Sequence, residues 1–308
     1  FATVWVQDPM VLYRSYLWAI AVPGLIAVVL TGFAPRTIYI LGAILMLLWS
    51  GLALERNLSL RDGFTAWGDA AEKVDLQAPP SAVGRWQAFL NLGGYHVDLG
   101  SLAAARKALN TAIALGEDHG YALFNLGLAA QHEKKHAEAL DWFARAQAKG
   151  FDMVLLPSHR GESLFALGQW APAYQSLSQA LTMPLTQSDQ TKYRTLRAET
   201  ALAVQQYDVA LEDFEALLKN SPNDSRLLQG LGLAQVGKGN TAAALAIFNP
   251  LIATSPNAAA YYGRAMAHLK AGDKTASLQD LDQTIALEPG NPRYREIRAQ
   301  IAAGQTPH

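Results

Sequence analysis

The chain has 308 residues, a net charge of −1, a pI of about 6.7 and no cysteine, and half of its residues are hydrophobic. Its near-neutral charge creates no long-range field, so nucleic acid is not an expected partner. The lack of cysteine excludes disulfides, thiolate metal sites and a cysteine nucleophile, without selecting a compartment. The length exceeds that of a typical single core, which favours a chain that grows by stacking repeats.

The N-terminal segment, residues 1–14, starts at Phe1 without an initiating methionine and opens on apolar residues. We interpret the chain as the C-terminal portion of a longer membrane protein.

Two uncharged runs come next, from Ser15 to Pro35 and from Thr37 to Leu54. Each is long enough to cross a hydrocarbon core of ~30 Å at about 1.5 Å per residue. Only Pro35 and Arg36 separate them, so residues 15–54 are predicted to form a transmembrane helical hairpin in contact with membrane lipid. A secretory signal peptide is the alternative for the first run, but that run is long and a second comes directly after it. The pattern predicts a multi-pass protein of the inner (plasma) membrane.

Residues 55–80 connect this hairpin to the rest of the chain. Leu60, Phe64, Trp67 and Ala71 are spaced by four, three and four residues, which places them on one helical face. The spacing predicts a lead-in helix that covers the open end of the first downstream repeat, with a break at residues 78–80.

From residue 81 to residue 290 one pattern occurs six times at a spacing close to 34 residues. A small residue marks each repeat, at Ala105, Ala139, Ala173, Ala210, Ala244 and Ser277. A bulky residue stands four positions later, at Leu109, Phe143, Leu177, Phe214, Phe248 and Leu281. Small side chains let two helices cross closely, and the bulky residue fills the space beside the crossing. With Leu-Gly pairs in three repeats and closing prolines, the pattern is similar to tetratricopeptide (TPR) repeats.

The sequence therefore predicts an all-α fold, in which a transmembrane hairpin precedes a TPR solenoid of six repeats. The last segment, residues 291–308, is predicted to hold a capping helix from about Arg293 to Ala302 that is polar on one side. The step before Ala210 is three residues longer than the common one, which predicts a longer loop at Thr186–Asp189.

The working surface of such a solenoid is expected to be the concave groove lined by the first helix of each repeat. Counting positions from each Leu-Gly pair predicts a groove for a protein or peptide partner. The predicted residues are Tyr121, Phe124, Gln131, His132, Glu162, Phe165, Lys192, Thr195, Glu199, Arg226, Gln229 and Tyr262. Aromatic rings, amides and single charges of both signs suit an extended peptide or a glycan-bearing polypeptide, although each side chain could instead serve only to build the solenoid.

The sequence offers little other chemistry. His132 and His136 are four residues apart, which on one helix face would suit a metal, but the repeat pattern places a turn between them. We therefore expect a solvated turn there, and we predict no catalytic residue, metal or cofactor in this chain.

Two strings around the apolar runs resemble a known family. Residues 7–18 read QDPMVLYRSYLW, and residues 55–73 contain Glu-Arg-Asn, then Asp62 to Trp67, then Ala-Ala-Glu-Lys. Together with the TPRs after them, this order resembles the C-terminal end of polytopic GT-C-type glycosyltransferase-like proteins. These are bacterial relatives of the eukaryotic transmembrane and TPR-containing O-mannosyltransferases. The resemblance covers roughly residues 1–75, and the family's Pro after Tyr-Leu is Trp18 here.

The resemblance implies that Asp8, Tyr13 and Arg14 form a membrane-edge motif that contributes to a lipid-phosphate edge of the active cavity. An Arg at that edge can bind a phosphate bidentately. The alternative is that Arg14 and Tyr13 only anchor a span at the interface. The family's catalytic acidic loop has no counterpart in this sequence, so a lipid-linked sugar would be bound only through upstream sequence.

The side of the membrane depends on two arguments that disagree. Arg36 lies on one side, with Arg14, Arg56 and Arg61 on the other, which favours a cytoplasmic solenoid by the positive-inside rule. The resemblance implies a periplasmic solenoid, and we adopt that side because upstream spans would dominate orientation.

Three functions remain open on the sequence. The first is an acceptor-recruiting tail of a lipid-linked-sugar protein O-glycosyltransferase. The alternative is a non-enzymatic TPR scaffold that assembles an envelope complex, in exopolysaccharide secretion or cytochrome assembly. A TPR protein without a membrane role is disfavoured by the two apolar runs.

Overall fold

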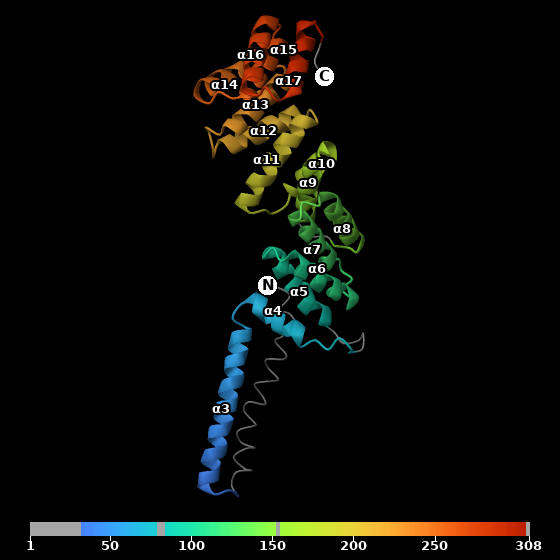
Figure 1. Ribbon diagram of the computed structural model, residues 1–308, viewed down its shortest axis with the longest axis vertical. Helices are drawn as coiled ribbons and strands as arrows, with labels where there is room; N and C mark the ends of the chain where they lie inside the picture. Colours follow the sequence, from blue (N-terminus) through green and yellow to red (C-terminus); the bar gives the residue numbers. More distant parts are fainter. Residues whose placement is uncertain (1–31, 79–83, 152–154, 306–308) are drawn as a thin grey trace. The chain divides into compact units, whose positions relative to one another are not determined.

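The computed structural model describes residues 32–78, 84–151 and 155–305. Within these ranges the regular structure is entirely helical, from α3 to α17, and no strand is present (Figure 1). The predicted all-α class is thereby confirmed. The chain divides into two compact units, one ending at Lys73 and the other beginning at Val74, and each is described by itself.

The first unit contains the long helix α3 (Pro35–Ser59), which includes the second predicted membrane run. Its apolar side chains are exposed, with Tyr39 at 78% and Leu47 at 74% exposure. In the described part of the chain, α3 alone has the length and composition needed to cross a membrane. Residues 1–14, with Asp8, Tyr13 and Arg14, and most of the first predicted span lie outside the described residues.

The short helix α4 (Gly63–Glu72) is the predicted lead-in helix, and it starts three residues later than expected. Asp62 caps it, because the Thr65 backbone N–H donates to Asp62 Oδ1 at 2.8 Å. Leu60 lies before this cap and is 55% exposed, so its predicted place on the apolar helical face is wrong. The packing of α4 on the first repeat stays a prediction.

The second unit is a stack of six helical hairpins, as predicted (Figure 1). Each hairpin has a first and a second helix, and the caps and turns between them are short. The hairpins are α5 (Arg85–Asp98) and α6 (Leu102–Ala114), α7 (Tyr121–His132) and α8 (His136–Ala148), α9 (Leu156–Ala166) and α10 (Trp170–Ala180), α11 (Gln187–Ala203) and α12 (Tyr207–Leu218), α13 (Ser225–Lys238) and α14 (Thr241–Thr254), and α15 (Ala258–Lys270) and α16 (Lys274–Leu287). The helix α17 (Pro292–Ala302) comes last as the predicted cap and buries Ile297 and Ile301.

The marker residues of all six repeats are completely buried, from Ala105 to Ser277. At each crossing a small residue of the first helix meets the bulky residue of the second. A Cβ added to Gly127 would lie 2.4 Å from Cε1 of Phe143, and one added to Gly232 would lie 2.5 Å from Cζ of Phe248. Such contacts leave no room for a side chain, so glycine sets the distance between the helices.

Two crossings have an Arg–Asp ion pair at the position where repeats 1, 2 and 5 have leucine, whereas repeat 3 has Arg160 there, which donates to Gln147 Oε1 at 3.1 Å. The position of Leu in the Leu-Gly pair holds Arg197 in repeat 4 and Arg264 in repeat 6. Arg197 donates to Asp213 at 2.7 and 2.8 Å, and Arg264 donates to Asp280 at 2.9 and 2.7 Å. Asp213 and Asp280 are buried, so both pairs lie inside their hairpins.

The extra three residues before Ala210 lengthen helix α11 and not a loop. This helix has 17 residues, whereas α9 has 11. Thr186 is its N-cap, because Thr186 Oγ1 accepts from the Asp189 backbone N–H at 3.1 Å and donates to Asp189 Oδ2 at 2.8 Å. The predicted loop at residues 186–189 is therefore wrong, since the Thr-x-x-Asp string starts a helix.

Candidate interaction face

The first helices of neighbouring repeats pack directly against one another along the second unit, from α5 with α7 to α13 with α15. Each second helix packs between its own first helix and the first helix of the next repeat. The first helices therefore share one continuous side of the stack. We call the surface they share the A face, and eleven of the twelve predicted partner residues lie on or beside it.

The predicted residues form a row of contacts that joins successive first helices. Gln131 of α7 contacts α9, Glu162 of α9 contacts α11, Glu199 of α11 contacts α13, and Gln229 of α13 contacts Asn257 at the start of α15. Tyr262 of α15 lies 5.5 Å from the Tyr294 ring of α17. The row thus ties each repeat from the second onward to its successor.

Two ion pairs occupy the middle of this row, and both partners of each were predicted. Glu162 pairs with Lys192, and Glu199 pairs with Arg226 at 2.5 Å. The carboxylates are 21% and 23% exposed, whereas Lys192 is 52% and Arg226 is 74% exposed. The cations therefore project toward solvent, whereas the carboxylates lie closer to the helices. Such exposed ion pairs contribute little to stability, and their cations are accessible to a partner.

A partly buried polar network joins repeats 2 and 3. Gln131 Nε2 donates to the His159 carbonyl at 2.7 Å and to Ser163 Oγ at 2.8 Å. His159 Nδ1 lies 3.0 Å from Gln131 Oε1, which only accepts, so Nδ1 carries the proton. Burial lowers the pKa of His159, which favours the neutral form of the ring. Gln131 is therefore occupied in joining repeats.

The other predicted residues differ in their access to a partner. Tyr121 is 42% exposed and meets the Phe151 ring edge-on at 5.3 Å. Thr195 lies between the two ion pairs, and its hydroxyl donates to the Thr191 carbonyl. Phe165 packs edge-on against Trp170 at 5.5 Å.

Phe124 requires a correction, because the structure does not place it on the surface. It is 6% exposed and stacks on Phe151 at 4.6 Å in a core cluster with Phe143. Phe124 is buried because its ring, together with the rings of Phe143 and Phe151, fills the space beside α7 and α8.

His132 ends α7 and His136 begins α8, so a turn separates the two histidines as the repeat pattern predicted. His132 is exposed at the edge of the A face. Its ring is thus accessible to a partner, without forming a helix-face pair with His136.

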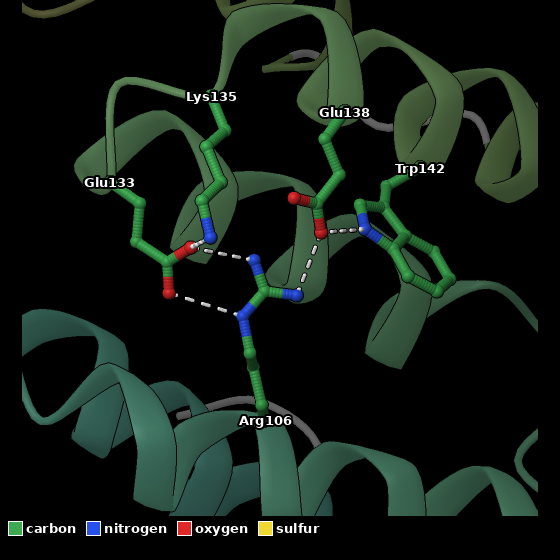
Figure 2. Close-up of polar contacts among 5 residues, drawn as sticks. All are labelled: Arg106, Glu133, Lys135, Glu138 and Trp142. Carbon is green, nitrogen blue, oxygen red and sulfur yellow. Dashed lines mark hydrogen bonds and ion pairs between the residues drawn. The ribbon is translucent and has the colours of Figure 1, made fainter.

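Sequence reasoning missed a charged cluster formed by second helices α6 and α8 and the turn between α7 and α8, which we call the Arg106 clamp. Arg106 of α6 lies between the carboxylates of Glu133 and Glu138 (Figure 2). It donates to Glu133 at 3.2 and 3.0 Å and to Glu138 at 2.8 Å. Lys135 contacts Glu133 at 2.7 Å, and Trp142 donates to Glu138 at 3.0 Å. The clamp joins repeat 1 to repeat 2.

The clamp makes the stability of this junction depend on pH. The hydrogen bonds from Arg106 and then Lys135 lower the pKa of Glu133 from 4.5 to about 2. A lowered folded-state pKa gives stability that is present above pH 4.5 and lost as the pH falls toward 2. We expect Glu133→Gln to lower the free energy of unfolding by on the order of 1 kcal/mol at pH 7. The variant should also lose less stability than the natural protein as the pH falls. Urea unfolding at a series of pH values from 7 to 3 measures both effects, and an equal loss of stability with pH in the two proteins would contradict the prediction.

Comparison with known proteins agrees with this architecture. The sequence matches the family model described as Tetratricopeptide repeat over residues 90–152, 195–259, 230–292 and 262–305, which together cover more than half of the chain. These matches include parts of five of the six hairpins and of the capping helix, and none of them falls on α9 or α10 of repeat 3.

Two curated relatives are cellulose synthase operon proteins. One is cellulose synthase operon protein C of Pseudomonas fluorescens (strain SBW25), 28% identical over 149 residues, which are 46% of this chain and 12% of that protein. The other is cellulose synthase 1 operon protein C of Komagataeibacter xylinus, 24% identical over 261 residues, which are 80% of this chain and 20% of that protein. The chain thus spans a fifth or less of these relatives' length.

Among solved structures, pilF of Pseudomonas aeruginosa is similar in fold. It is 19% identical, covers 70% of this chain and 97% of its own, and gives a TM-score of 0.46.

Proposed function

Because the chain belongs to the tetratricopeptide repeat family, we propose that it is a membrane-anchored scaffold, which binds another protein of an exopolysaccharide machine through its A face. TPR repeats are protein-interaction modules, and a protein or peptide is the partner that their extended surface suits. The observation that carries the proposal is the row of paired charges and amides along the first helices. Such groups can bind a partner non-covalently, through ion pairs and hydrogen bonds.

The A face favours a partner segment that carries carboxylates and apolar side chains. Lys192 and Arg226 project outward, while Glu162 and Glu199 lie closer to the helices. A carboxylate on the partner would meet the cations first, and Tyr121 adds an exposed ring for an apolar side chain. The partner is thus proposed as an extended acidic and apolar polypeptide segment.

The two curated relatives indicate the setting. Both belong by name to a cellulose synthase operon, and the longer match includes 80% of this chain. They support a role in exopolysaccharide synthesis or secretion, which was the alternative weighed from the sequence. Because the chain covers so little of their length, the role of the whole relatives is not transferred.

The glycosyltransferase tail is the second candidate, carried by the resemblance of residues 1–75. It would give Asp8, Tyr13 and Arg14 a role near a lipid-linked sugar. The relatives named above are operon proteins of polysaccharide synthesis, which favours the scaffold.

Helix α3 supports anchoring in the inner membrane. Its apolar surface is exposed over more than the ~20 residues that a span needs. With the first apolar run, it would form the proposed multi-pass anchor, and the solenoid would lie in the periplasm. The arginine count is the argument for a cytoplasmic solenoid.

The anchor is tested by deleting residues 15–59. The full chain is expected to stay with membranes after an alkaline carbonate wash, and the deleted chain is expected to appear in the soluble fraction. The thermal midpoint of the solenoid is the control, since it should not change. A deleted chain that still sediments with membranes would contradict the anchor.

The side of the membrane is read in the same preparation. The chain has no cysteine, so Ser188→Cys introduces a single thiol at an exposed position of α11. A membrane-impermeant maleimide should label it from the periplasmic side, and labelling only after lysis would place the solenoid in the cytoplasm.

A further inference from the structure

Repeat 3 carries a surface that differs in chemistry from the rest of the stack. No Asp, Glu, Lys, Arg or His occurs between Ser163 and Ser188, a stretch that includes the whole of α10. The second helices α6, α8, α12 and α16 each carry charged residues. Helix α14 is also uncharged, but its exposed side chains are mostly alanines, whereas Gln169, Gln175 and Gln179 are exposed on and beside α10.

An exposed indole ring lies at the start of this surface. Trp170 is 42% exposed at the first position of α10, and Leu167 beside it is 40% exposed. The ring lies against Gly168, where an added Cβ would be 3.6 Å from Cζ2 of Trp170. Phe165 supports it edge-on, with ring centroids 5.5 Å apart. The Trp is therefore held on two sides while much of it faces solvent.

The same position of repeat 4 shows what an ordinary structural role looks like. There Tyr207 packs against Gly237 of the next repeat, where an added Cβ would lie 2.2 Å from Cε1 of the Tyr. Tyr207 thus fills the space between hairpins, and it is only partly exposed. Trp170 is larger and more exposed, so packing between repeats does not account for it.

We propose that α10 and the turn before it bind a neutral glucan chain, with Trp170 as the ring on which one sugar stacks. A pyranose ring has C–H groups on its faces and hydroxyls at its edge. An indole face suits the first, and the amides of Gln169 and Gln175 suit the second. An uncharged polymer brings no charge to balance, so a surface without charged groups imposes no cost of desolvating them.

This inference rests on the proposed function, because the polymer class comes from a role in exopolysaccharide synthesis or secretion. It adds a ligand and a surface on second helix α10, which adjoins the A face where Phe165 contacts Trp170. A scaffold with both would hold a protein partner on its first helices and the polymer on repeat 3.

The test uses the full chain in detergent with cellohexaose as the probe. N-bromosuccinimide oxidises exposed tryptophans, and mass spectrometry locates the oxidised residue among the seven in the chain. Cellohexaose is expected to protect Trp170, and charged oligogalacturonate is not. Equal oxidation of Trp170 with and without saturating cellohexaose would overturn the proposal, and equal protection by oligogalacturonate would overturn the argument from charge.

Matched variants separate this surface from the A face. Trp170→Ala is expected to weaken cellohexaose binding at least tenfold. Tyr121→Ala removes a ring of the same 42% exposure from repeat 2 and should leave binding unchanged. Equal losses in both variants would contradict a site at Trp170. Capture of the protein partner that depends on Trp170, with no cellohexaose binding, would assign the surface to a protein and overturn the proposal. Failure of the unsubstituted chain to capture a protein partner, with cellohexaose binding retained, would instead remove the proposed scaffold function and leave the glucan site standing.

Discussion

Replacing Asp213 by alanine is expected to destabilise the solenoid by about 3 kcal/mol. Asp213 is 1% exposed and accepts two hydrogen bonds from Arg197, which is 18% exposed. Its removal leaves a guanidinium inside the hairpin without its carboxylate, and Arg194, 3.6 Å from Asp213, loses a partner too. The value is at the low end for a broken buried pair because Arg197 keeps some contact with water. Urea unfolding of the full chain measures the change.

The control for this prediction is already present in the chain. Repeat 5 has Leu231 and Ile247 at the positions that Arg197 and Asp213 occupy in repeat 4. The double variant Arg197→Leu and Asp213→Ile should therefore be close to the natural protein in stability, or more stable by about 1–4 kcal/mol. If the double variant were as unstable as Asp213→Ala, the carboxylate would have a role beyond its pairing with Arg197.

Two adjacent glycines of α5 are expected to respond in opposite directions to the same substitution. Gly93→Ala should destabilise the protein by about 1–3 kcal/mol, since a Cβ there would lie 2.6 Å from Cγ of the buried Leu109. Gly94→Ala should stabilise it by about 0.5–1 kcal/mol, because nothing lies within 4 Å and alanine favours a helix. Hydrogen exchange of α5 and α6 reports the change in this repeat.

Each glycine is the control for the other, because the two residues are adjacent in the same helix and both are replaced by alanine. Equal effects in the two variants would show that helix propensity alone determines the outcome. Helix crossing would then not depend on the small residue at Gly93.

The repeat pattern predicted the fold well because it records contacts within each hairpin. The recurring small residues and the bulky residues four positions later are all buried at the crossings. The exception is the longer step before Ala210, which we placed in a loop. A spacing gives the number of added residues, whereas the Thr186 cap decides that they join helix α11.

The candidate site could be predicted only in part. Position counting correctly put Glu162, Lys192, Glu199 and Arg226 together, because it identifies the side of a helix. It cannot tell how deeply a side chain on that side is buried, and so it placed the buried Phe124 on the surface.

The missed charged groups have a different cause. Arg106 reaches Glu133 and Glu138 in the next repeat, 27 and 32 residues away. Arg197 and Asp213 are 16 residues apart, as are Arg264 and Asp280. Such pairs span turns and helix contacts, where no helical or strand periodicity indicates them. The shared separation of 16 residues in two repeats was a signal that could have found the last two.

The central claim, that the A face binds a protein partner, is tested most directly by photo-crosslinking in native membranes. A photoreactive amino acid at Thr195 lies between the two ion pairs of the A face, and the same group at Glu212 lies exposed on second helix α12. We predict that Thr195 crosslinks a protein of the exopolysaccharide machinery, identified by mass spectrometry, and that Glu212 does not. Crosslinking of that protein from Glu212 but not from Thr195 would contradict the account.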